Sequence, residues 1–122
     1  MSNILEKIVN QKKIDLLSVK KKYTNNLLSS LIKQNKSYIN FKNRIANNIK
    51  QNKISVIAEI KKASPSAGLI IKQYNPIAIA ENYILNGATC LSILTEEKFF
   101  LGDLQHITDV KNKFKIPILC KD

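Results

Sequence analysis

Charged side chains interrupt an apolar stretch near the middle of the chain, and their types and spacing suit acid–base chemistry. Residues 56–60 read VIAEI, a branched apolar run that predicts a buried strand. Glu59 and Lys61 are two positions apart, so on a strand both side chains point to the same face. A carboxylate and an ammonium on a buried strand are costly unless they are paired or used in function. The small residues at 63–68, ASPSAG, then predict a loop with turn chemistry.

A second lysine occupies the corresponding place on a later predicted strand. Residues 116–121 read IPILCK, so Lys121 ends this strand as Lys61 ends the first. Proteins of the α/β class place their active sites at the carboxyl ends of parallel strands. We therefore take both lysines as candidate functional residues. Two other interpretations stay open, because Glu59 and Lys61 also suit a structural ion pair and Lys121 also suits a solvated lysine.

The elements that precede the first strand are predicted to be helical. Asn3 and Glu6 have the spacing of a capping box, and apolar residues recur along a helix to about Lys22. Ser37 is predicted to cap a further helix, whose apolar residues recur every four positions: Phe41, Ile45 and Ile49. We define residues 1–53 as an N-terminal helical extension.

From residue 54 onward, strands and helices alternate. Asn75 and the proline after it predict a helix start, and Gly87 predicts the end of that helix. Residues 88–95 then form a second strand, and Asp103 starts the next helix. This alternation predicts an α/β fold with a parallel sheet in residues 54–122.

The last predicted strand has no helix after it to cover it. A parallel sheet needs helices on its faces, so three strands resemble the start of a longer (β/α) chain. A closed (β/α)8 TIM barrel takes about 250 residues. We therefore expect residues 54–122 to be the first βαβαβ part of such a barrel, holding three of its eight strands.

Positive charge concentrates in the N-terminal part of the chain, whose net charge is +11. Residues 1–53 hold twelve of the 20 Lys and Arg residues and two acids, whereas residues 54–122 hold eight against seven acids. This favours a solvated helical surface, because the aromatic residues do not alternate regularly with the lysines as they do in base-stacking proteins. A basic arm that binds RNA or DNA is the alternative hypothesis.

Cysteine and histidine usage gives little support for a metal site or a disulfide framework. Cys90 and Cys120 are 30 positions apart and belong to no CxxC pair, and the single histidine, His106, lies on a predicted outer helix where we expect it to face solvent. No apolar run approaches the roughly 18 residues of a membrane span, and the N-terminus lacks the apolar region of a secretory signal. We expect a protein of the reducing cytoplasm.

Four segments together resemble a known family: VIAEIKKASPSAG at 56–68, YNP before the helix at 76, SILTEEKFFLGD at 92–103 and PILCKD at 117–122. In this order and spacing they are similar to indole-3-glycerol-phosphate synthase of tryptophan biosynthesis. The resemblance implies a (β/α)8 barrel whose N-terminal extension lies over the catalytic end. It also implies conversion of 1-(2-carboxyphenylamino)-1-deoxyribulose 5-phosphate to indole-3-glycerol phosphate, CO2 and water, with no metal or organic cofactor.

The same resemblance implies a role for each candidate residue. Lys121 would be the general acid that protonates the substrate ketone, with a pKa lowered by nearby cations and partial desolvation. Lys61 would contact the substrate carboxylate and take part in later proton transfers, and Glu59 would hold Lys61 in position. Ser64 would bind substrate, although a turn role fits it equally well. Phe100 would lie against the anthranilate ring, and its neighbour in sequence would pack elsewhere.

The resemblance also implies that much of a synthase lies beyond these residues. The remaining barrel strands and the phosphate site near strands 7 and 8 have no counterpart here. We therefore expect the 122 residues alone to be inactive and poorly folded. Fusion to another enzyme of the pathway stays open, and so does a truncated chain that serves as an interaction protein through its exposed strand edge.

Overall fold

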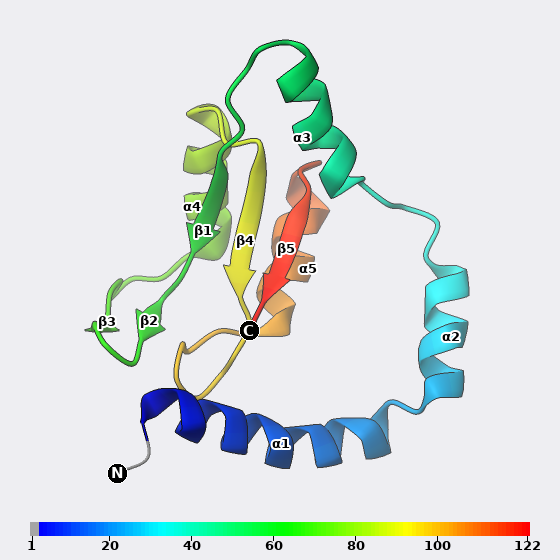
Figure 1. Cartoon of the computed structure of the whole chain (residues 1–122), viewed down its shortest axis with the longest axis vertical. Helices are drawn as coiled ribbons and strands as arrows, with labels where there is room; N and C mark the ends of the chain where they lie inside the picture. Colours follow the sequence, from blue (N-terminus) through cyan, green and yellow to red (C-terminus); the bar gives the residue numbers. More distant parts are fainter. Residues whose placement is uncertain (1–2) are drawn as a thin grey trace. The chain divides into compact units, whose positions relative to one another are not determined.

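The computed structural model describes residues 3–122, and the chain forms two compact units. The first unit ends at Tyr38, and the second runs from Ile39 to Asp122 (Figure 1). The third helix, α3 (Phe41–Lys50), therefore belongs to the same unit as the sheet. The functional boundary that we expect after residue 53 stays a prediction, because a division by contacts does not test it.

The first unit consists of two helices, α1 (Ile4–Lys22) and α2 (Asn25–Gln34). The Asn3 side chain accepts the backbone N–H of Glu6 at 2.8 Å, which satisfies one of the free amide groups of the first turn. The predicted start and end of the first helix are thus confirmed. Thr24 caps α2 in the same manner, accepting the N–H of Leu27 at 3.3 Å.

The predicted start of α3 at Ser37 is wrong by three residues. Asn40 is the cap, and its side chain accepts the N–H of Asn43 at 2.9 Å. The N–H of Ser37 instead donates to the side chain of Asn35 at 3.2 Å. Serine and asparagine cap helices about equally well, so composition alone did not distinguish the two positions.

The sheet of the second unit is parallel and has three strands: β1 (Ile57–Ile60), β4 (Cys90–Leu94) and β5 (Ile118–Lys121). β4 lies between the other two strands. Figure 1 shows all three arrows pointing toward the same edge. The α/β class and the parallel sheet are therefore confirmed.

Helices α4 (Pro76–Leu85) and α5 (Leu104–Lys113) lie on one face of this sheet (Figure 1). Their predicted caps are confirmed, since the side chains of Asn75 and Asp103 accept N–H groups of the first turns. Alternate strand residues meet the helices in one buried apolar cluster: Ile60, Ala80, Leu91, Ile93, Val110 and Ile116. The other face of the sheet carries the side chains of the alternate positions, which include Glu59, Ser92 and Lys121.

Two sequence-based expectations need correction here. The small-residue segment after β1 is not a plain loop but an antiparallel hairpin of β2 (Ala63–Ser64) and β3 (Gly68–Leu69). Gly68 has φ of 65°, a left-handed conformation that glycine adopts without strain. His106 faces solvent only in part, because its ring packs against Tyr74 at a centroid distance of 5.3 Å. Among residues 3–122, no helix is long and apolar enough to cross a membrane.

The buried cluster predicts a sharp contrast between two isoleucines. Ile93 is 0% exposed and Ile54 is 88% exposed. We expect Ile93→Ala to lower the free energy of unfolding by about 2–5 kcal/mol in urea titrations of the full-length gene product, because it leaves a cavity. The matched variant Ile54→Ala should change it by less than about 0.5 kcal/mol. Equal losses would contradict this account of the core.

Candidate active site

The carboxylate of Glu59 lies between two lysines at the carboxyl edge of the parallel sheet. Its Oε2 accepts a hydrogen bond from Lys121 Nζ at 2.6 Å, and its Oε1 lies 3.3 Å from Lys61 Nζ. The side chain of Glu59 is 30% exposed, that of Lys61 34% and that of Lys121 50%. Three of the predicted site residues are therefore brought together, in a cluster that is open to solvent.

The two lysines favour the charged form of Glu59. The hydrogen bond from Lys121 is the largest cause that lowers the pKa of this carboxyl below its usual value, and Lys61 adds to the effect. Partial burial acts in the opposite direction but does not cancel it. The site therefore holds one carboxylate and two ammonium groups, with a surplus of positive charge that suits an anionic substrate.

The strand register explains how residues far apart in sequence form this cluster. Glu59 is opposite Ser92 on β4, and Lys121 on β5 is opposite Leu94. All four positions share the face turned away from the helices, because side chains alternate along a strand. The Ser92 hydroxyl is buried on this face and has no hydrogen-bond partner among residues 3–122. A buried hydroxyl therefore lies on the same face as the ion pairs, next to the buried Leu94.

A tyrosine on α4 also supports the site. The hydroxyl of Tyr83 on α4 donates to the backbone carbonyl oxygen of Glu59 at 3.0 Å. Its ring packs against the apolar cluster, so the hydroxyl needs a buried acceptor. This bond ties α4 to β1 at the residue that bridges the lysines. A tyrosine on an apolar helix face was the only sequence signal for it.

Ser64 closes a turn in the structure. Its hydroxyl accepts the N–H of Ala67 at 3.1 Å and lies 3.4 Å from the Ser66 hydroxyl. The residue is 9% exposed. The turn interpretation left open above therefore describes its observed contacts, and its role in substrate binding stays a prediction.

Phe100 lies in the segment between β4 and α5 and is partly buried. Its N–H donates to the carboxylate of Glu96, which also accepts the N–H groups of Lys98 and Phe99. Sequence analysis did not single out Glu96, because nothing in its type distinguishes it from the adjacent Glu97. The structure separates them, since Glu96 is 6% exposed and binds three amides whereas Glu97 is exposed.

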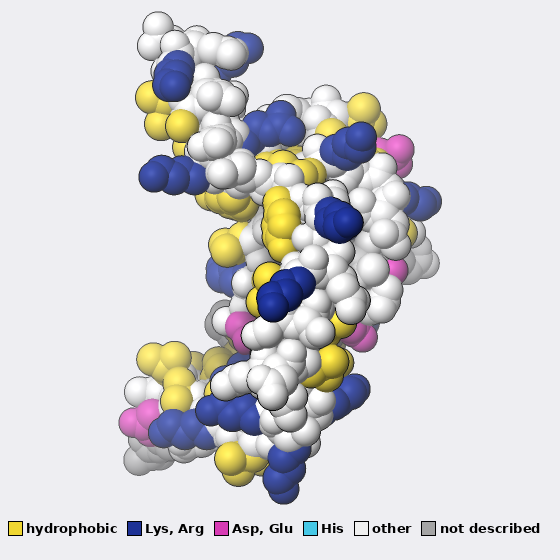
Figure 2. All heavy atoms as spheres, turned by 90° about the vertical axis from the view of Figure 1, so that its right-hand side faces the viewer, with side chains coloured by type: hydrophobic (Ala, Val, Ile, Leu, Met, Phe, Trp, Pro, Cys, Tyr) yellow, Lys and Arg dark blue, Asp and Glu magenta, His cyan; other side chains and the backbone are white. Residues whose placement is uncertain are grey.

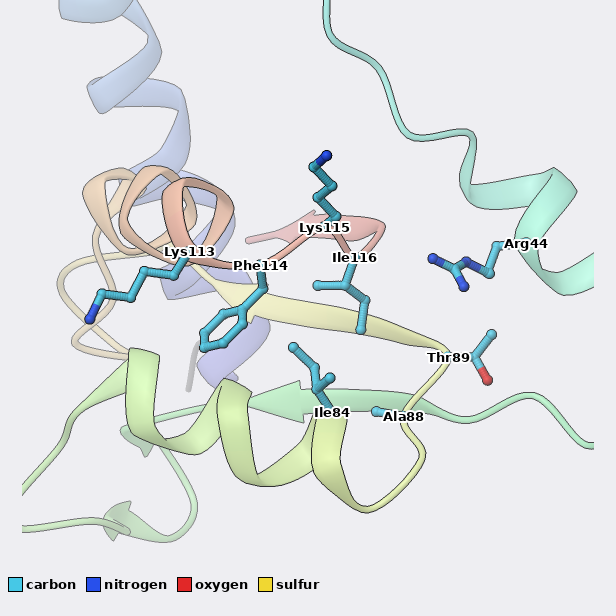
Figure 3. A pocket seen from close by; sticks show the side chains of 8 residues that line it. All are labelled: Arg44, Ile84, Ala88, Thr89, Lys113, Phe114, Lys115 and Ile116. Carbon is cyan, nitrogen blue, oxygen red and sulfur yellow. The ribbon is translucent and has the colours of Figure 1, made fainter.

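A hollow lies at the opposite, amino end of the strands, with a volume of about 330 Å³. Figure 3 shows apolar side chains and three cations around it, from Arg44, Lys113 and Lys115. The guanidinium of Arg44 points toward the hollow, but the two lysine side chains extend away from its centre. The cations do not converge as those at Glu59 do, so this hollow is the weaker candidate site.

Lys and Arg side chains also occur away from the Glu59 cluster. On the face shown in Figure 2 they occupy several places on the surface, with neutral and apolar atoms between most of them. Among residues 3–122, no three His, Cys, Asp or Glu side chains are grouped as metal ligands.

The hydrogen bond between Lys121 and Glu59 predicts that the pKa of Glu59 depends on Lys121. We expect Lys121→Met to raise this pKa toward the usual glutamate value, because the variant removes the strongest cause of its lowering. Titration of the Glu59 carboxyl by ¹³C NMR measures the change. Lys115→Met, at the opposite end of the sheet, is the control and should leave the titration unchanged. A Glu59 pKa that is insensitive to Lys121→Met would contradict the bridge.

The same lowered pKa of Glu59 makes the free energy of unfolding depend on pH in the acid range. A carboxyl whose pKa falls on folding stabilises the protein fully above its unfolded pKa, near 4.5, and loses this contribution as pH falls through its lower folded value. We therefore expect the stability difference between wild type and Glu59→Gln to shrink as pH is lowered from about 7 to about 3. A difference that stays constant in urea titrations across this range would disprove the linkage.

Comparison with known proteins assigns the chain to a family. The family model described as indole-3-glycerol phosphate synthase matches residues 5–122. Curated relatives with that name are 39% identical in Microcystis aeruginosa, 38% in Aliarcobacter butzleri and 40% in Alkaliphilus metalliredigens. Each alignment covers 98% of this chain, and the chain spans 40%, 45% and 44% of these relatives respectively. With nearly every residue inside the match, the chain belongs to the indole-3-glycerol phosphate synthase family.

Proposed function

We propose that the full-length product of this gene converts 1-(2-carboxyphenylamino)-1-deoxyribulose 5-phosphate to indole-3-glycerol phosphate, CO2 and water. The observation that carries the proposal is the Glu59 carboxylate between Lys61 and Lys121 at the carboxyl edge of a parallel sheet. Family membership supports it, as do the relatives that are named for this synthase. The substrate carries a carboxylate and a phosphate, and the surplus positive charge of the cluster suits the carboxylate.

The proposal includes a fold and a location. Residues 54–122 supply the first three strands of a (β/α)8 barrel, and the parallel order of β1, β4 and β5 supports this. Active sites of such barrels form at the carboxyl ends of the strands, which is where the two lysines lie. The enzyme acts in the cytoplasm and uses no metal or organic cofactor.

Lys121 acts as the general acid in the ring-closing step. The ring carbon that bears the carboxylate attacks the ketone carbon, and the ketone oxygen takes a proton from the Lys121 ammonium to become a hydroxyl. The Lys121 ammonium donates a 2.6 Å hydrogen bond to Glu59, and this contact supports the role because it holds the acid in a defined position. Loss of CO2 then restores the aromatic ring. The new hydroxyl takes up a proton and leaves as water, and the neighbouring CH2 carbon gives up a proton, which forms the double bond of the indole.

Lys61 and Glu59 set the geometry around this step. The Lys61 ammonium binds the substrate carboxylate that leaves as CO2, and it serves in the later proton transfers. Glu59 orients both lysines, although the resemblance alone assigned it to Lys61. Its shorter contact is to Lys121, which supports a role in aiming the general acid.

Two further residues complete the proposed binding surface. Phe100 forms an aromatic wall against the anthranilate ring, since a flat apolar group gains from such a contact. Ser64 binds the substrate through its hydroxyl. This hydroxyl can donate a hydrogen bond to the substrate while it accepts the N–H of Ala67.

Turnover of the carboxyphenylamino substrate, followed by the fluorescence of the indole product, tests the proposal. We expect the full-length gene product to be active and residues 1–122 alone to be inactive. Lys121→Met should lower kcat by at least about 100-fold, because general acid catalysis contributes about 10² to 10⁴. Lys115→Met, away from the site, should keep full activity. A full-length protein without turnover, or with an active Lys121→Met variant, would contradict the proposal.

A further inference from the structure

We infer that Glu96 is a positioning residue, whose buried carboxylate fixes Phe100 beside the site. The inference rests on the proposed function, in which Phe100 contacts the substrate ring. Oε1 of Glu96 accepts the N–H of Lys98 at 2.9 Å, and Oε2 accepts those of Phe99 at 2.6 Å and Phe100 at 3.0 Å. One side chain thus binds three successive backbone amides.

The backbone of the same residue closes the segment from the other side. The carbonyl oxygen of Glu96 accepts the N–H of Gly102 at 2.7 Å. Gly102 itself passes so close to β4 that an added Cβ would lie 2.3 Å from the carbonyl oxygen of Leu94. Leu101, between them, has φ of 52°, a left-handed conformation that costs a non-glycine residue free energy. Glu96 therefore holds this segment twice, through its side chain at residues 98–100 and through its backbone carbonyl at Gly102.

This segment begins directly beside the proposed general acid. Thr95, the residue before Glu96, donates its backbone N–H to the Lys121 carbonyl oxygen at 2.8 Å, and its hydroxyl donates to the same oxygen at 3.2 Å. The segment that Glu96 holds and Lys121 therefore lie at the ends of neighbouring strands, β4 and β5. A shift of residues 96–102 would move Phe100 relative to the reacting atoms.

Burial of a carboxylate makes this arrangement different from an ordinary surface turn. A carboxylate that is 6% exposed loses hydration, and among residues 3–122 the three amide donors are the hydrogen-bond partners that compensate for it. The adjacent Glu97 is exposed and makes no hydrogen bond or ion pair with residues 3–122. An exposed turn needs no such anchor, whereas a preorganised binding wall does.

A double-mutant cycle in the full-length gene product tests the inference. Glu96→Gln keeps the shape of the side chain but replaces one acceptor oxygen by a donor, so it cannot bind all three amides. We expect Glu96→Gln and Phe100→Ala each to lower kcat/KM by about 10- to 100-fold, mainly through KM, because both misplace or remove the ring wall. The double variant should be no worse than Phe100→Ala alone. Glu97→Gln is the matched control and should match wild type.

The outcomes separate failure of this inference from failure of the proposed function. Losses that multiply in the double variant, or a Glu96→Gln variant with wild-type KM, would overturn the positioning role while leaving the synthase activity standing. A wild-type protein without turnover would overturn the proposed function and this inference with it. Should Glu96→Gln not fold, Glu96→Asp takes its place in the cycle, since a shorter carboxylate reaches fewer of the three amides.

Discussion

The half-buried carboxylate of Glu59 is the constraint on which the arrangement of the site depends. A negative charge on this strand needs compensation, and it receives two ammonium groups, from its own strand and from β5. The Lys121 contact requires β4 to lie between β1 and β5 in the observed register. The helices behind the sheet maintain that register by burying its apolar face, and Tyr83 adds a direct bond to the backbone of Glu59.

Local sequence signals sufficed for most of the fold. Asn3, Asn75 and Asp103 were predicted as helix caps and are caps, because the side chains of these residues satisfy amides that are close in sequence. Ser37 was predicted on the same reasoning and is not a cap, since Asn40 competes for the same helix with an equally suitable side chain. The hairpin that contains Ser64 was missed because its strands have only two residues each, too few to form a periodic pattern.

The site was predictable only where chemistry could be read along one strand. The shared face of Glu59 and Lys61 follows from their spacing, and the structure confirms their contact. The contact to Lys121 could not be derived in the same way, because it depends on the register of three strands. Glu96 and Tyr83 were missed for a related reason, since their partners are backbone groups that no side-chain pattern reveals.

The most direct test of this account is a crystal structure of the full-length protein with an unreactive substrate analogue whose ketone is reduced to an alcohol. The account predicts that the analogue's alcohol oxygen lies within hydrogen-bond distance of Lys121 Nζ, its carboxylate against Lys61 and its ring against Phe100. Glu59 should keep its contacts to both lysines in that complex. An analogue bound away from the carboxyl edge of β1 and β5, or one that leaves Lys121 without contact, would contradict the account.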